Sequence, residues 1–258
     1  MHGDTGRAPY GMDTYGSRSL AVGGQAIKVA GERLVEKARI IAAHQLEVSV
    51  DDVEFNAGTY SVKGDPEKAT TIQAVAFEAF TAHNLPDGVE PTLSGESTVD
   101  PMDFSYPHGT HLAAIEVDTE TGQVTLRRII TVDDAGRVLN PLVVEGQRHG
   151  GIAQGVGQAL LEEVRWDPDG NPVTSNLADY GMISATELPA YELILMETPT
   201  PANPLGAKGI GESGAIGATP ALHNAVVDAL APFGVRHLDL PTTPQRVWQA
   251  LQDAAAAP

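Results

Sequence analysis

The chain contains no cysteine among its 258 residues. A disulfide framework, an iron–sulfur cluster and a thiolate metal site are therefore excluded within this chain. Basic residues are also few: 16 lysines and arginines stand against 34 acidic residues, so the formal net charge is −18. Such a charge does not suit a phosphate-backbone partner, and we expect no nucleic acid to bind.

Long apolar runs are missing as well. No stretch approaches the roughly 18 apolar residues of a membrane span, so we expect no such span. The first seven residues lack the apolar core of a signal peptide, which predicts a cytoplasmic protein. Eight histidines are scattered without a carboxylate at ligand spacing, so we expect no metal site built from histidine. Hydrophobic residues still make up 42% of the chain, which is enough for a packed core.

The hydrophobic pattern mixes helices with antiparallel hairpins and shows no regular βαβ alternation, which predicts an α+β fold. Ser19 and Thr71 are expected to cap the first two helices, and Pro220 is expected to begin a later one. The acidic pair Asp133 and Asp134 is expected to bond locally with Arg137 and to hold a loop. The predicted helices cover residues 20–45, 72–80, 142–161, 220–231 and the stretch from 244; the predicted strands and hairpins cover 53–62, 110–118, 123–132 and 193–197.

The most informative segment is GAKGIGESG at residues 206–214. Four glycines surround the carboxylate of Glu212, and a helical pattern follows. Glycine allows close approach of backbone to a ligand, and a helix start offers unpaired N–H groups. Taken alone, the segment is about equally well interpreted as a surface turn, because Gly-rich motifs have a real false-positive rate.

Three further motifs accompany this loop. They are TYGSRS at residues 14–19, VDDAGRVLNP at 132–141 and EGQRHGGIAQGVGQAL at 145–160. Together with the glutamate loop, and in this order, they resemble the molybdenum hydroxylases, the family of xanthine oxidase, aldehyde oxidase and the large subunit of aerobic carbon monoxide dehydrogenase. The resemblance covers residues 1–258 as the C-terminal half of the molybdopterin-binding region, which is one domain fragment of a larger catalytic subunit.

The resemblance implies which residues hold the cofactor. Gly16, Ser17 and Ser19 correspond to a pterin-binding loop, and Arg18 adds a charge-assisted contact to phosphate. Gln147 corresponds to a glutamine beside the molybdenum cofactor. In the glutamate loop, Gly209 and Gly211 allow close approach. Lys208 is interpreted as an anchor of the loop or a phosphate contact or, about equally well, as a surface lysine.

Glu212 is the expected catalytic residue. In the family reaction a carbon centre of an aldehyde, an N-heterocycle or carbon monoxide is hydroxylated with water as the oxygen source. A partly desolvated carboxylate with a raised pKa is a useful base for the proton released in that step. The metal is held by the cofactor's dithiolene, so the lack of cysteine is consistent with this interpretation.

The resemblance also implies partners. The molybdopterin, with a cytosine dinucleotide as one alternative form, carries the molybdenum; FAD and 2Fe-2S clusters would lie on partner chains. We therefore expect the missing first half of the subunit, an iron–sulfur subunit and a flavin subunit as partners, and a small-molecule substrate. Two alternatives stay open: a non-catalytic truncated scaffold that binds no cofactor alone, and a generic α+β protein whose Gly-rich loops bind another phosphate.

Overall fold

The computed structural model describes residues 3–7, 10–11 and 13–256. It divides into two compact units, one of residues 22–101 and the other of residues 1–21 and 102–258. Within the described ranges, no helix is both long enough and apolar enough to cross a bilayer. The mixture of helices with small sheets confirms the predicted α+β class.

The unit of residues 22–101 is a three-stranded antiparallel sheet with two helices. Its elements are helix α1 (Gln25–Leu46), a 3₁₀ turn (Val50–Asp52), strands β1 (Val53–Asn56), β2 (Thr59–Val62) and β3 (Asp65–Thr71), and helix α2 (Ile72–Thr81). The predicted hairpin and helix are confirmed, and the Thr71 hydroxyl accepts a bond from the Ala74 N–H at 3.2 Å as the expected N-cap. Strand β3 was not predicted. Its burial pattern is almost wholly exposed, so it has no apolar alternation to detect.

The start of the first helix differs from the prediction. Ser19–Gly24 forms a π-helix, and α1 begins only at Gln25 with Gly24 as its N-cap residue. The Ser19 hydroxyl bonds the Thr14 hydroxyl at 2.5 Å, so it is engaged within its own loop. Two consecutive glycines at 23 and 24 also favour helix poorly, which is consistent with a wider turn before the regular helix.

The unit that contains the C-terminus is built on a second three-stranded sheet. Strand β5 (Val124–Asp134) lies in the middle, antiparallel to β4 (His108–Val117) and parallel to β6 (Tyr191–Met196). The long hairpin of β4 and β5 was predicted, but β5 extends two residues beyond the expected end and includes Asp133 and Asp134. A bulge between Ala114 and Ile115 shifts the pairing by one residue.

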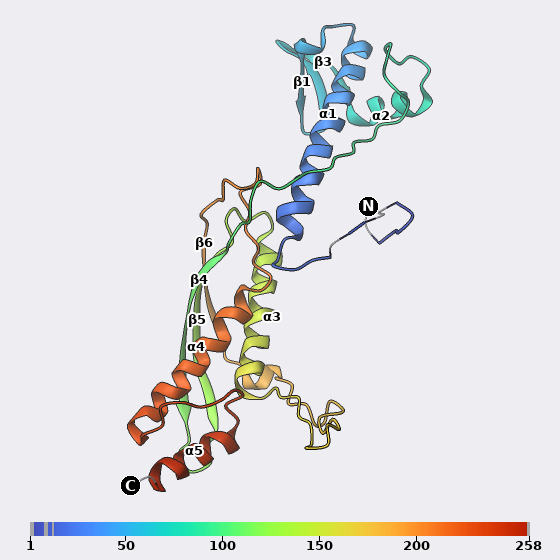
Figure 1. The fold of residues 1–258 in the computed structure, drawn as a ribbon. Coiled ribbons are helices and arrows are strands. Elements are labelled where there is room, and N and C mark those ends of the chain that lie inside the picture. Colours follow the sequence, from blue (N-terminus) through green and yellow to red (C-terminus); the bar gives the residue numbers. More distant parts are fainter. Residues whose placement is uncertain (1–2, 8–9, 12, 257–258) are drawn as a thin grey trace. The chain divides into compact units, whose positions relative to one another are not determined.

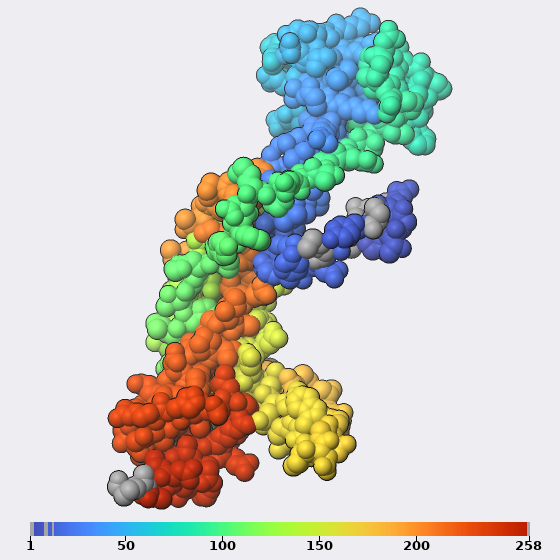
Figure 2. Space-filling model, in the orientation of Figure 1, coloured from blue at the N-terminus to red at the C-terminus, as the bar shows by residue number. Residues whose placement is uncertain are grey.

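Helices α3 (Pro141–Leu160) and α4 (Ser213–Leu230) pack side by side, and α4 also contacts β4 (Figure 1). Small residues permit this close packing: a Cβ at Gly155 would lie 2.9 Å from the Cβ of Ala218. The core between the sheet and these helices includes Ile129, Ile152 and Leu222, all fully buried. Helix α5 (Pro244–Ala256) closes the unit, after short 3₁₀ turns at Ala185–Glu187 and Ala231–Phe233. The segment between α3 and β6, yellow in Figure 2, stands out from these packed elements.

Helix α4 begins seven residues earlier than predicted, so Pro220 lies inside it. Proline in a helix interior removes one backbone hydrogen bond and normally breaks the helix. Here packing on α3 compensates, because the Thr219 hydroxyl bonds the Gly155 carbonyl oxygen at 3.2 Å and the Gln158 side chain at 3.0 Å. The earlier start places Glu212 directly before the first helical residue.

Candidate functional site

Two loops that are almost 200 residues apart in sequence meet in the C-terminal unit. The Gly211 N–H donates to the Ser17 hydroxyl oxygen at 2.9 Å. A Cβ at Gly209 would lie 2.3 Å from the Ser17 carbonyl oxygen, so only glycine permits this approach. The expected pterin loop and the glutamate loop are therefore docked against each other.

Ser17 holds an uncommon backbone conformation at this contact. Its φ is +53°, and Gly16 before it has φ +60°. A non-glycine residue in the left-handed region costs about 1–3 kcal/mol and persists where surrounding contacts hold it. The hydroxyl accepts from Gly211 and keeps its own hydrogen, for which no acceptor occurs among the described residues. One donor on a half-buried side chain is thus left for a ligand.

Gln147 reaches the same loop from helix α3. It lies in the second turn of α3 and is exposed. A Cβ at Gly211 would lie 3.4 Å from the Gln147 Oε1, next to the Ser17 hydroxyl at 3.0 Å. The structure therefore brings Ser17, Gln147 and Gly211 together, as a shared site requires.

Glu212 follows Gly211 directly and occupies the N-cap position of α4. Its side chain makes no capping bond, is exposed, and has no hydrogen-bond partner or ion pair within the described part of the chain. The expected partial desolvation is therefore not provided by the residues described here. The carboxylate is free to meet a group that approaches the site.

The other predicted residues of the first loop are engaged locally. The Arg18 guanidinium lies over the Tyr15 ring, 3.8 Å from its centroid, and donates to the Asp13 carbonyl oxygen at 2.8 Å. Ser19 is exposed and bonds Thr14. These contacts stabilise the shape of the loop around Ser17.

Lys208 forms an ion pair with Asp134 at 2.8 Å, and both side chains are largely buried. Asp134 also accepts from the backbone N–H groups of Gly136 and Thr198. Burial raises the pKa of Asp134, but these donors outweigh it and lower the pKa to about 2. This geometry supports the interpretation of Lys208 as an anchor of the glutamate loop.

A buried polar network lies beneath the site and was not predicted. The Asp133 carboxylate accepts from His111 Nε2 at 3.0 Å and from Arg148 Nε at 2.8 Å. Arg148 also donates to the Thr131 hydroxyl at 2.9 Å and to the Ile194 carbonyl oxygen at 2.7 Å. The expected pairing of the two aspartates with Arg137 is wrong, because their partners are the distant residues Arg148 and Lys208.

The network keeps Asp133 ionised. Burial raises the pKa of Asp133, but hydrogen bonds from His111, Thr131 and Arg148 outweigh it, so the pKa lies below its usual value. An ionised carboxylate only accepts, so His111 carries a proton on Nε2. Its Nδ1 is buried and has no partner among the described residues.

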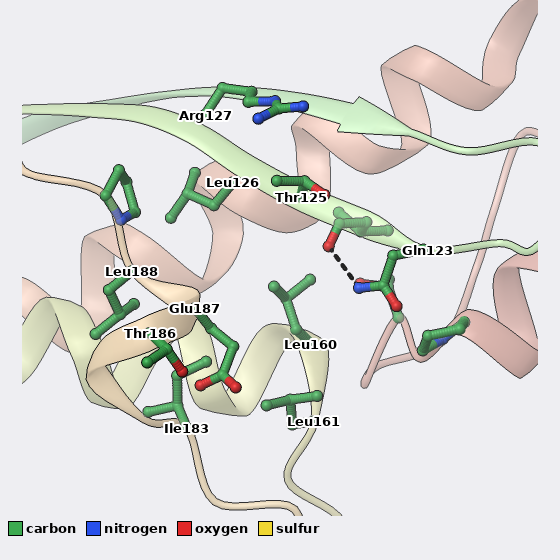
Figure 3. Close-up of a pocket in the computed structure, with 14 residues that line it drawn as sticks. Gln123, Thr125, Leu126, Arg127, Leu160, Leu161, Ile183, Thr186, Glu187 and Leu188 are labelled. Carbon is green, nitrogen blue, oxygen red and sulfur yellow. Dashed lines mark hydrogen bonds between the residues drawn. The ribbon is translucent and has the colours of Figure 1, made fainter.

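Among the hollows of this unit, two bear on the location of the site. One, of about 280 Å³, is lined by His111, Asp133, Ser213 and Gly217 beside the glutamate loop. The other, of about 340 Å³, lies at the opposite end of β5 and α3, between Leu126, Leu160 and Ile183 (Figure 3). No predicted site residue lines the second hollow, whose walls mix apolar and polar side chains, so it is separate from the candidate site.

In this α+β unit a glycine-rich loop and a polar loop thus meet beside an exposed carboxylate. The family model of the molybdopterin cofactor-binding domain matches residues 1–189, and the chain belongs to this family. The resemblance to the large subunits of molybdenum hydroxylases is thereby confirmed.

Individual relatives agree with this membership. The chain is 43% identical to the carbon monoxide dehydrogenase large chain of Hydrogenophaga pseudoflava, over 97% of this chain and 31% of that protein. It is 39% identical to subunit gamma of the 6-hydroxypseudooxynicotine dehydrogenase complex of Paenarthrobacter nicotinovorans, over 98% of this chain and 32% of that protein. Its fold matches CO dehydrogenase from Oligotropha carboxidovorans with a TM-score of 0.89 and 37% identity, over 97% of this chain and 31% of the other. The chain thus spans about a third of the length of these relatives.

Proposed function

We propose that this chain is the C-terminal half of the molybdenum-cofactor domain of an oxidoreductase that hydroxylates a carbon centre with water as the oxygen source. The observation that carries the proposal is the convergence of Ser17, Gln147 and Gly211 directly beside Glu212. When bound, the molybdenum cofactor supplies the two-electron redox centre at which the substrate carbon is oxidised.

The residues present fit such a cofactor by the chemistry of their donors. The Ser17 hydroxyl keeps a hydrogen to donate, and the exposed amide of Gln147 donates and accepts at once. A pterin edge and a phosphate both need donors of this kind. In our proposal Gly16, Arg18 and Ser19 shape the loop that presents Ser17. Lys208, Gly209 and Gly211 hold the glutamate loop against it.

Glu212 is proposed as the general base. It is exposed and lacks a partner among the described residues, so no internal contact competes with its role. We propose that the remaining part of the subunit covers this face, because the relatives are about three times as long as the chain. Covering would desolvate the carboxylate and raise its proton affinity, as a base requires.

The partners and substrate follow from the same proposal. The relatives are named as a large chain and as a subunit of a complex, which supports iron–sulfur and flavin subunits as carriers of 2Fe-2S and FAD. One relative is named for carbon monoxide and another for 6-hydroxypseudooxynicotine, so the substrate class is a small molecule that family membership does not specify. The cytosine dinucleotide stays one of the possible forms of the pterin.

The decisive experiment replaces Glu212 by glutamine in the assembled enzyme. The amide keeps size and hydrogen bonding but takes no proton, so turnover per molybdenum should fall roughly 10²- to 10⁴-fold while molybdenum content stays normal. Glu116→Gln is the matched control, because Glu116 is an exposed glutamate on β4 whose partner is Arg127.

A second variant separates binding from chemistry. Ser17→Ala should lower the molybdenum content more than the turnover of the loaded fraction. If Glu212→Gln turns over like the parent at full molybdenum loading, Glu212 is not the base. If the parent enzyme binds no molybdenum or pterin, the scaffold alternative holds instead.

A further inference from the structure

The buried network of His111, Asp133 and Arg148 has no part in the chemistry proposed above, yet it joins helix α3, which carries Gln147, to helix α4, which begins directly after Glu212. Arg148 directly follows Gln147 on α3. His111, on β4, lies against Gly217 of α4, five residues after Glu212. The side chains of His111, Asp133 and Arg148 are 3%, 1% and 4% exposed, so the network is part of the interior.

The α3 end of the network is held by several bonds. Arg148 donates to Asp133 on β5, to the Thr131 hydroxyl beside it, and to the Ile194 carbonyl oxygen on β6. A guanidinium bonded in several directions has little rotational freedom. The first turns of α3, and with them the backbone at Gln147, are therefore fixed to the sheet.

The α4 end of the network is a packing contact. A Cβ built on Gly217 would lie 2.4 Å from His111 Nδ1 and 2.5 Å from its Cε1, so the helix backbone rests directly on the imidazole. The Nε2 of the same ring is bonded to Asp133 at 3.0 Å. The ring therefore supports α4 from a position that Asp133 determines.

We propose that His111 is a positioning residue for Glu212: the imidazole, fixed by Asp133 and through it by Arg148, sets the place of the first turns of α4 relative to Gln147. This inference rests on the proposed role of Glu212 as the base. Catalytic groups need support from rigid surroundings, and a displacement of about 1 Å costs as much as roughly 100-fold in rate. The His111 contact is a rigid support of that kind, because it joins β4, β5 and α4 through one ring.

The test compares His111→Ala with His111→Gln in the assembled enzyme. Alanine removes both the bond to Asp133 and the surface under Gly217. We expect kcat per molybdenum to fall about 10- to 100-fold with KM and molybdenum content near the parent values. Hydrogen exchange of the amides of residues 216–219, the first that bond within the helix, should become about 10-fold faster, a readout that does not depend on turnover.

Glutamine is the conservative variant, because its side-chain amide can donate to Asp133 from about the position of Nε2. We expect it to recover most of kcat and of the exchange protection. His237→Ala is the matched control: His237 also bonds an aspartate, Asp239, at 3.1 Å, but on the exposed surface. It should leave both measurements unchanged.

Several results would overturn the proposal. Parent-like kcat and exchange in His111→Ala would show that the ring positions nothing, and a loss of molybdenum with unchanged kcat per molybdenum would show a structural role alone. If Glu212→Gln keeps its turnover, the proposed function fails, whereas the exchange measurement still reports on the support of α4.

If His111→Ala does not fold, Gly217→Ala tests the same contact from the helix side. Alanine is the better helix former, so a lower kcat would come from the clash with the ring and not from a weaker helix. A parent-like kcat in Gly217→Ala would then overturn the proposal.

Discussion

Asp133 and Glu212 are carboxylates of the same unit in opposite settings. Asp133 lies inside, accepts from three side chains, and is held as an anion. Glu212 lies on the surface at a helix start, and no partner for it occurs in the described ranges. The first is held by three donors in the interior, whereas the second is available to another molecule.

This difference distinguishes a carboxylate that stabilises the fold from one that is proposed to take part in the reaction. Buried charges are retained where partners compensate their desolvation, and removal of one partner is costly. An exposed carboxylate gains little from the fold and can be changed without unfolding it. In our proposal, stability therefore depends on Asp133 and its partners, and activity depends on Glu212. Three predictions test this division, from the largest effect to the smallest.

Arg148→Met should have the largest effect. It leaves Asp133 buried without its cation, which typically costs about 3–5 kcal/mol of unfolding free energy. Urea unfolding of the subunit measures this change. The double variant Arg148→Met, Asp133→Asn also removes the unpaired buried charge. It should therefore recover part of the lost free energy of unfolding. A change in unfolding free energy below about 0.5 kcal/mol in Arg148→Met would mean that the buried pair does not stabilise the fold, since surface substitutions typically have effects of this size.

The sequence predicts the helices and the long hairpin because their apolar periodicity is local. It does not predict the Asp133 network, since that depends on contacts between residues far apart. The hairpin pairing predicts which residues of β4 and β5 are neighbours, but the bulge after Ala114 and the two extra residues of β5 change the register and the end. The partner Arg148 comes from a helix whose placement no local pattern indicates.

The glutamate loop shows the converse case. Its glycines and its carboxylate are visible in the sequence, and the resemblance indicates a loop at residues 14–19 that shares the site. The helix after it was predicted too late, because Gly214, Gly217 and Pro220 all disfavour helix. Packing of α4 on α3 overrides that preference, and this tertiary effect is absent from any local pattern.

The ionised Asp134 is expected to make a smaller contribution to the free energy of unfolding, and acid should remove it. Its pKa is about 2 in the folded chain against an ordinary 3.8, so folding favours the charged form. The stabilisation, of about 2 kcal/mol, is therefore present above pH 4 and lost as the pH falls towards 2. Unfolding free energies of the parent and Asp134→Asn should differ at pH 6 and converge near pH 2. A difference that does not change with pH would show that the ion pair with Lys208 contributes no charge-dependent stability.

The smallest effect is expected for Glu192→Gln. Glu192 on β6 pairs with Arg128 on β5, and both side chains are about half exposed. The hydrogen bond from Arg128 lowers the pKa of Glu192, yet water competes for the same groups, and exposed pairs of this kind contribute little. The thermal midpoint and the turnover of Glu192→Gln should both match the parent within error. A clear drop in the midpoint would mean that an exposed carboxylate also contributes to the stability of the fold. Exposure alone would then not distinguish stabilising carboxylates from functional ones such as Glu212.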